Sequence, residues 1–193
     1  MWMILDSESF KEAKVTLLLI SVNTLCYIVF NLSLDVEYLL FLAQVNSKVI
    51  EDLELWRLIT SMFLHADALH LFSNMVALLI FGAAIENNFP RYQYLIIYFI
   101  SGLIGNLFSL VLLPLYVISL GASGAIFGLI GAAFIFFVRE DPSLIGLSLL
   151  YVFYFIVMSF QPGINYWAHI FGLAGGVLFG YIFKRKSRYE EYY

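Results

Sequence analysis

The sequence predicts an all-α membrane protein, a bundle of six transmembrane helices with a long, partly embedded loop between helices 1 and 2. Apolar residues make up 62% of the 193-residue chain and charged residues only 12%, whereas soluble domains carry about 25% charged residues. Uncharged stretches run from Tyr92 to Val138 and from Pro142 to Phe183. Because a helix satisfies its own backbone hydrogen bonds in lipid, helices are the expected spanning form.

The individual spans follow from the lengths of the uncharged stretches. A bilayer core about 30 Å thick needs roughly 20 apolar residues in helical form. The stretch after Tyr92 is long enough for two helices, with a break between Pro114 and Gly121, and Gln161-Pro162-Gly163 divides the last stretch. The expected helices form one domain over residues 1–193 and cover 15–34, 68–87, 91–113, 122–138, 143–160 and 165–184.

Basic residues set the expected orientation, since cytoplasmic loops are enriched in lysine and arginine. With six spans both termini lie on one side, and that side receives eight basic residues against two on the other. The two are Lys48 and Arg57, and the eight are Lys11, Lys14, Arg91, Arg139, Lys184, Arg185, Lys186 and Arg188. We therefore expect a multi-pass protein of the cell membrane with cytoplasmic termini. The net charge of -4 gives no reason to expect nucleic acid as a partner.

The connection from Asp35 to Asp67 is the one long loop, and it combines acidic residues with apolar ones. Its segments Leu55-Trp56-Arg57-Leu58-Ile59 and Met62-Phe63-Leu64 are too apolar to lie in water. We expect this loop to be structured and partly embedded at the outer face of the membrane. Trp56 and Arg57 are its expected interfacial anchors.

Five polar residues are costly in lipid and therefore indicate a site. His65, His70, Asn74, Ser123 and His169 lie near the outer ends of expected helices. His70 and Asn74 share a helical face, because they are four residues apart. Ser123 begins a helix that runs for only 16 residues before a charge, which is roughly 24 Å. The serine is therefore expected below the outer surface, at a helix N-terminus with unpaired N–H groups and a positive dipole.

Small residues recur along one side of the fourth helix and one side of the sixth. They are Gly121, Gly124, Gly128 and Gly131 in the fourth, and Ala168, Gly172, Gly176 and Gly180 in the sixth. Stripes of this kind let membrane helices approach at backbone distance. We expect the two helices to touch, which would bring Ser123 and His169 within hydrogen-bond reach at similar depth.

This pairing predicts nucleophilic catalysis by an activated serine. A serine hydroxyl becomes a nucleophile when a neighbouring base takes its proton, and His169 is the candidate base. The backbone N–H of Ser123 and the side chains of His70 and Asn74 are candidate donors to the oxyanion. Asp67 precedes the second helix, where capping is its expected role. The sequence therefore predicts a Ser–His dyad without an aspartate.

These residues resemble the rhomboid family of intramembrane serine proteases over nearly the whole chain. The resemblance is carried by Trp56-Arg57, His65 with His70-x-x-x-Asn74, Gly121-Ala122-Ser123-Gly124, and Ala168-His169-x-x-Gly172-x-x-x-Gly176. It implies that Ser123 is the nucleophile and His169 the general base, and that His70 and Asn74 line the oxyanion hole. Gly121 would hold the loop before the serine helix, with Gly124 as a further supporting residue.

One position departs from the rhomboid pattern. Family members commonly carry a tyrosine one turn after the serine, packed against the catalytic histidine, and this chain has Phe127 there. We expect the ring to stack on His169 without the hydroxyl contact. The resemblance implies no cofactor and no metal, and it implies transmembrane segments of other proteins as substrates in the lipid bilayer. The oligomeric state is left open.

Three other classes compete with the protease interpretation. A non-catalytic rhomboid-like protein that binds transmembrane helices is the strongest alternative, against which Ser123 and His169 argue. A metal site of His65, His70 and His169 would lack the His-Glu-x-x-His pattern of metalloproteases. A transporter would be expected to carry intramembrane charge. For a protease, we expect substrates to pass beside the fifth helix, with residues 161–165 as a movable cap.

Overall fold

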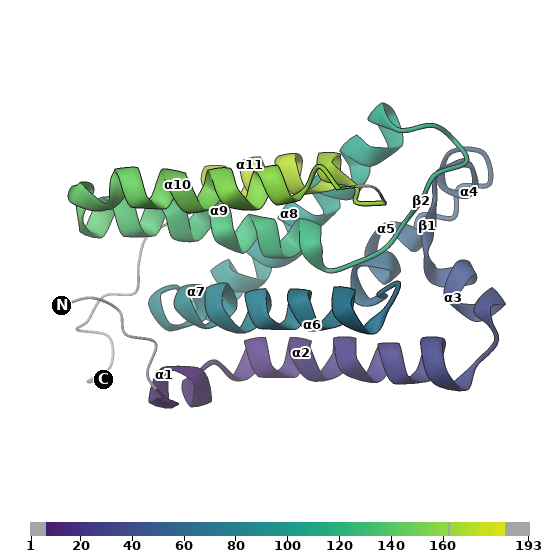
Figure 1. Cartoon of the computed structure of the whole chain (residues 1–193), viewed down its shortest axis with the longest axis horizontal. Helices are drawn as coiled ribbons and strands as arrows, with labels where there is room; N and C mark the ends of the chain where they lie inside the picture. The colour runs from purple at the N-terminus through teal and green to yellow at the C-terminus, as the bar shows by residue number, and fades with distance from the viewer. Residues whose placement is uncertain (1–6, 162, 184–193) are drawn as a thin grey trace.

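The fold is known from a computed structural model, which describes residues 7–161 and 163–183, and within these residues it is a helical bundle (Figure 1). Four helical segments are long and apolar enough to cross a membrane: Lys14–Ser33, Ala68–Asn88, Arg91–Leu112 and Ser123–Glu140. Two further apolar helices, Pro142–Met158 and Tyr166–Ile182, are shorter. The helices agree with the expected ranges to within two residues at every described end. The basic residues expected at 184–188, the end of the last range and Pro162 lie outside the described residues.

The first two long segments are each assembled from consecutive helical pieces. The short helix α1 (Ser7–Glu12) precedes α2 (Lys14–Tyr27), which continues as the π-helical η1 (Ile28–Ser33). The second segment consists of α6 (Ala68–Ala77), the π-helical η3 (Leu78–Gly82) and α7 (Ala83–Asn88). Glu86 of α7 accepts the N–H groups of Val15 and Thr16 at 2.9 and 2.8 Å. It thereby satisfies donors at the start of α2 that the helix itself cannot bond.

The remaining helices are α8 (Arg91–Leu112), α9 (Ser123–Glu140), α10 (Ile145–Met158) and α11 (Tyr166–Ile182), with the 3₁₀ turn η4 (Pro142–Leu144) before α10. The helix α9 is the interior element, since 11 of its 18 residues are buried. None of the 14 residues of α10, all of which are described, is buried. This contrast makes α10 the peripheral helix of the bundle.

The long connection between η1 and α6 is folded rather than extended. It contains α3 (Val36–Leu42), β1 (Gln44–Val45), α4 (Asn46–Ile50), α5 (Arg57–Thr60) and the 3₁₀ turn η2 (Ser61–Phe63). The strand β1 pairs antiparallel with β2 (Ile118–Ser119), with Gln44 opposite Ser119. These elements gather at one end of the molecule, and α1 and α7 lie at the other (Figure 1). The pairing ties the connection to the segment that leads into α9.

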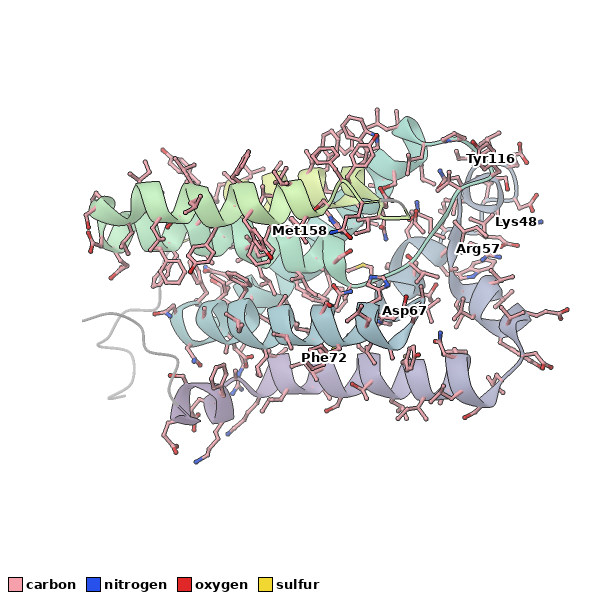
Figure 2. All side chains as sticks on the ribbon, viewed as in Figure 1. Lys48, Arg57, Asp67, Phe72, Tyr116 and Met158 are labelled. Carbon is pink, nitrogen blue, oxygen red and sulfur yellow. The ribbon has the colours of Figure 1, made fainter. Side chains whose placement is uncertain are left out.

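The role expected for Arg57 was wrong. Its side chain is only 5% exposed, and its guanidinium donates to the carbonyls of Leu40 and Ala43 at 2.6 and 2.7 Å and pairs with Glu54. Arg57 therefore holds the connection together from inside (Figure 2), because free carbonyls at the end of α3 are close enough to bind it. Trp56 keeps the exposed position that an interfacial anchor needs.

The glycine stripes bring α9 and α11 into backbone contact, as the spacing predicts. A β-carbon on Gly172 would overlap the carbonyl group of Gly124, and one on Gly176 would overlap that of Gly128. One on Gly180 would lie 2.8 Å from the Cα of Ala132. At the other end of this interface, Arg139 donates to the carbonyls of Gly180 and Tyr181 at 3.1 and 2.9 Å.

This packing predicts that Gly176→Ala destabilises the protein. The added methyl group meets rigid backbone, so α9 and α11 must separate at a cost of about 1–3 kcal/mol. Gly146→Ala is the matched control, because a β-carbon at Gly146 has no neighbour within 4 Å and alanine favours a helix by about 1 kcal/mol. Thermal unfolding in detergent should show a lower midpoint for Gly176→Ala alone. Equal midpoints for the two variants would contradict the tight interface.

Candidate active site

The hydroxyl of Ser123 lies 2.7 Å from Nε2 of His169. Ser123 is the first residue of α9, and His169 lies on the first turn of α11, where it is 7% exposed. The two side chains therefore meet as the glycine stripes predict. Their catalytic roles remain predictions that the geometry permits.

Phe127 stacks on the candidate base. Its ring lies 4.2 Å from the His169 ring, centroid to centroid, with an angle of 11° between the planes. The expected stacking is confirmed. Because Phe127 covers one face of the imidazole, the ring is fixed with its edge toward Ser123.

The start of α11 is fixed by Asn165, which sequence analysis placed only in the expected cap over residues 161–165. Its Oδ1 accepts the N–H of Ala168 at 3.1 Å, which caps the helix. Its side-chain amide donates to the hydroxyls of Ser109 and Ser119 at 2.8 and 2.9 Å. An asparagine just before an apolar helix is a recognisable N-cap signal, and here it sets the position of His169.

A second missed residue, Ser159, contacts the other ring nitrogen of His169. Its hydroxyl lies 2.7 Å from Nδ1. The residue directly follows α10, and nothing in its sequence context separates it from other serines at helix ends. Only the packing of α10 beside α11 brings the two groups together.

Gly121 shapes the space in front of Ser123. Its φ angle is +132°, which favours glycine, and its N–H donates to the carbonyl of Ser61 at 2.9 Å. A β-carbon here would lie 3.0 Å from Nε2 of His70 and 3.6 Å from Oγ of Ser123. His70 and Ser123 therefore border the same small space, which a side chain at position 121 would fill.

His70 presents Nε2 to that space in a form that can donate. The N–H of Ala66 points to Nδ1 of His70 at 3.4 Å, so in the neutral ring the hydrogen belongs on Nε2. Asp67 caps α6 by accepting the N–H of His70 at 2.8 Å, as expected. Asn74, one turn further, is buried and donates to the carbonyl of His70 at 3.1 Å. These contacts make His70 a candidate oxyanion donor, with Asn74 beside it.

His65 is buried behind this donor and makes an edge-to-face contact with it. Its side chain is 0% exposed, and the ring centroids of His65 and His70 are 5.0 Å apart. Neither ring nitrogen of His65 has a hydrogen-bond partner within residues 7–161 and 163–183. Burial, with a smaller contribution from His70, lowers the pKa of His65 to about 3. His65 is therefore neutral near pH 7.

The three histidines do not gather as metal ligands. Across the described part of the chain, no three His, Cys, Asp or Glu side chains come together in an arrangement that could hold a metal ion.

The part of the chain that carries the candidate site is similar in sequence to known proteins. The family described as Rhomboid domain matches residues 52–186. The Bacillus subtilis (strain 168) rhomboid YdcA is 39% identical over 144 residues, which cover 70% of this chain and 72% of YdcA. The chain belongs to the rhomboid family. This rhomboid is also similar to RHOMBOID-like protein 6, mitochondrial, of Arabidopsis thaliana, with 36% identity over 75% of the chain.

The matches to other rhomboids are confined to part of each relative. Rhomboid-like protease 3 of Toxoplasma gondii is 38% identical over 48% of this chain and 35% of its own length. The chain spans 50% of the Arabidopsis relative. Every candidate site residue lies within residues 52–186, the part of the chain that the Rhomboid domain family matches.

The buried His65 predicts a pH dependence of stability. The unfolded chain takes up a proton at His65 below about pH 6.5, and the folded chain does not until about pH 3. The contribution of the buried, neutral His65 to stability is therefore fully present above about pH 6.5. It is lost as the pH is lowered toward 3, by up to about 1.4 kcal/mol per pH unit. His65→Phe keeps an edge-to-face ring but has no group that takes up a proton in this pH range.

The measurement compares thermal unfolding at pH 7.5 and pH 5 for wild type and His65→Phe in the same detergent. We expect the loss of unfolding temperature at pH 5 to be smaller in the variant. The difference between the two pH values is compared within each protein, so a change in packing cancels. An equal loss in both proteins would show that His65 is already protonated or exposed in the folded state.

Proposed function

We propose that this rhomboid is an intramembrane serine endopeptidase that hydrolyses peptide bonds in or near transmembrane segments of other membrane proteins. The observation that carries the proposal is the 2.7 Å contact between Oγ of Ser123 and Nε2 of His169. The pair lies at the N-terminus of a largely buried helix, beside the donor His70. A purely structural serine would need no base within hydrogen-bond reach.

In the first half of the proposed reaction, His169 acts as general base. Nε2 takes the proton of Ser123 as Oγ forms a bond to the scissile carbonyl carbon, and the carbonyl π electrons move to oxygen. The tetrahedral intermediate collapses as the carbon–nitrogen bond breaks. Nε2–H of His169 then protonates the departing amine, which leaves an ester between Ser123 and the carbonyl half of the substrate.

In the second half, water takes the place of serine as nucleophile. Nε2 of His169 removes a proton from water as its oxygen attacks the ester carbon. The carbon–oxygen bond to Ser123 breaks and the proton returns to Oγ. A carboxylic acid is released, and both catalytic residues regain their starting state.

The oxyanion in both halves needs fixed donors. The backbone N–H of Ser123, at the positive end of α9, and Nε2–H of His70, which lies beside Gly121, are two proposed donors. Asn74 is the third proposed donor, since its amide keeps one N–H beyond the bond to the His70 carbonyl. In a site with little water, each such donor is worth more than in solution.

The proposed topology places this site below the outer surface of the cell membrane. Six spans within a single domain are proposed, with both termini in the cytoplasm and α10 and α11 as the two shorter crossings. From Ser123 to Arg139 the helix rises roughly 25 Å, less than the bilayer core of about 30 Å. With Arg139 at the cytoplasmic surface, Ser123 is recessed from the opposite one.

The proposed substrate path lies beside α10. Tyr151, Phe153 and Tyr154 of this helix are exposed and suited to contact with lipid. Phe155 closes the path, because its ring lies edge-on to Phe81 of η3 at 5.6 Å and to Phe127 at 6.3 Å. A transmembrane segment locally unwound near its outer end would displace this contact to reach Ser123.

The central test is cleavage of a model transmembrane substrate by the protein reconstituted in lipid vesicles. Ser123→Ala and His169→Ala should abolish cleavage while retaining helical content by circular dichroism. His70→Ala and Asn74→Ala should reduce kcat, each by roughly 10²–10³. A fluorophosphonate should label wild type at Ser123. Undiminished cleavage by Ser123→Ala would refute the assignment, and binding of substrate without cleavage by wild type would favour the non-catalytic alternative.

The proposed path is tested by joining α10 to η3. Phe81→Cys and Phe155→Cys are combined in a Cys26→Ser background, which removes the only native cysteine, and linked by a short bis-maleimide. Cleavage of the membrane substrate should fall by about tenfold or more, and fluorophosphonate labelling should change little because the probe is small. The unlinked double variant is the control for the two lost rings. Equal cleavage before and after linking would reject this path.

A further inference from the structure

The nitrogen of His169 that faces away from Ser123 is bound by a second serine. Oγ of Ser159 lies 2.7 Å from Nδ1 of His169 and 2.8 Å from the carbonyl oxygen of Phe155. Ser159 is only 2% exposed, although it directly follows the peripheral helix α10. The bond reaches from the end of α10 to the first turn of α11.

The Phe155 carbonyl fixes the direction of this bond. A serine hydroxyl has one hydrogen, and a carbonyl oxygen can only accept. The backbone N–H of Ser159 donates to the carbonyl of Ile156 at 3.0 Å rather than to that of Phe155, so the last turn of α10 leaves the Phe155 oxygen to the hydroxyl. Because the Ser159 hydrogen points to Phe155, its oxygen must accept a hydrogen from Nδ1 of His169.

That direction determines which ring nitrogen of His169 is free. A neutral imidazole carries one hydrogen; when it sits on Nδ1, the lone pair of Nε2 faces Oγ of Ser123 at 2.7 Å. This is the form that can accept the serine proton. If Ser159 donated instead, the imidazole hydrogen would sit on Nε2 and His169 could not act as the base.

We infer that Ser159 is a positioning residue for the reaction, the third member of a Ser123–His169–Ser159 relay that sets the tautomer of the base. The inference rests on the proposed protease function. Ser159 does not touch substrate and acts through His169. After proton transfer both ring nitrogens carry hydrogen, and Ser159 continues to accept from Nδ1, so it supports the cationic ring as well. A neutral hydroxyl does this without the desolvation cost of a carboxylate.

The relay also couples the base to the position of α10. No residue of α10 is buried, so few contacts hold this helix, and Ser159 provides a polar tie from its end to His169. Entry of a substrate past Phe155 displaces the ring contacts with Phe81 and Phe127, whereas the bond from Ser159 keeps the end of α10 beside His169. His169 therefore stays set as a base while the substrate is in place.

The kinetic test compares Ser159→Ala, Ser159→Thr and Ser148→Ala, each as the full chain in vesicles. Loss of the hydroxyl leaves the buried Nδ1–H without its acceptor, so Ser159→Ala should lower kcat roughly tenfold with KM unchanged. Ser159→Thr keeps the hydroxyl and should restore most of the rate. Ser148 lies on α10 itself, so Ser148→Ala is the matched control and should behave as wild type.

The spectroscopic test reads the tautomer without any activity. Nitrogen-15 NMR of histidine-labelled protein distinguishes ring nitrogens with and without hydrogen, and His169→Gln assigns the signals among only three histidines. We expect hydrogen on Nδ1 of His169 in wild type and Ser159→Thr. In Ser159→Ala we expect a mixture of both tautomers.

The outcomes separate this inference from the proposed function. An unchanged tautomer in Ser159→Ala, with or without loss of activity, overturns the relay. So does a rise in KM at constant kcat, which would place Ser159 on the substrate path instead. A tautomer change in a protein that cleaves no substrate would refute the protease proposal while upholding the role of Ser159.

Discussion

The close approach of α9 and α11 is the constraint on which the rest of the structure depends. Gly172 and Gly176 have no room for a β-carbon against the backbone of Gly124 and Gly128. Between helices in lipid there is little hydrophobic driving force, so van der Waals contact at backbone distance is what holds them together. The same contact brings the first residue of α9 to the first turn of α11, where Ser123 and His169 meet. The interface that packs α9 against α11 therefore also forms the candidate catalytic pair.

Around that interface, polar groups are satisfied by the protein itself and thereby fix the site. Asn165 caps α11 before His169, Asp67 caps α6 before the turn that carries His70, and the Gly121 N–H is held by the carbonyl of Ser61. Each contact satisfies a helix end or loop that would be costly in a medium with little water. Because these bonds are short-range and directional, they fix the positions of the candidate catalytic groups. Apart from Asp67, these partners are neutral, as expected where an unpaired charge would be expensive.

Two findings lay beyond the sequence for a common reason. Arg57 lies in an apolar segment typical of an interfacial anchor. It is nevertheless buried, because the connection folds so that the carbonyls of Leu40 and Ala43 accept from its guanidinium. Ser159 stands at the end of an apolar helix like many serines, yet it binds His169 because α10 packs beside α11. In both cases the partner lies 10 to 17 residues away in the sequence, as a backbone group or as a side chain on another helix. Neither the periodicity of the sequence nor a motif predicts such a hydrogen bond.

The sequence by itself determined the helical membrane class, the helix bounds to within two residues, the family motifs and the candidate residues Ser123, His169, His70 and Asn74. These depend on local quantities: the length of uncharged stretches, the spacing of glycines and the turn chemistry at helix ends. Only the tertiary structure decided which nitrogen of His169 faces Ser123, how the long connection is bound through Arg57, and that α10 contributes a hydroxyl to the site. Those features depend on the direction of hydrogen bonds between different helices and loops, which is fixed only when the helices pack.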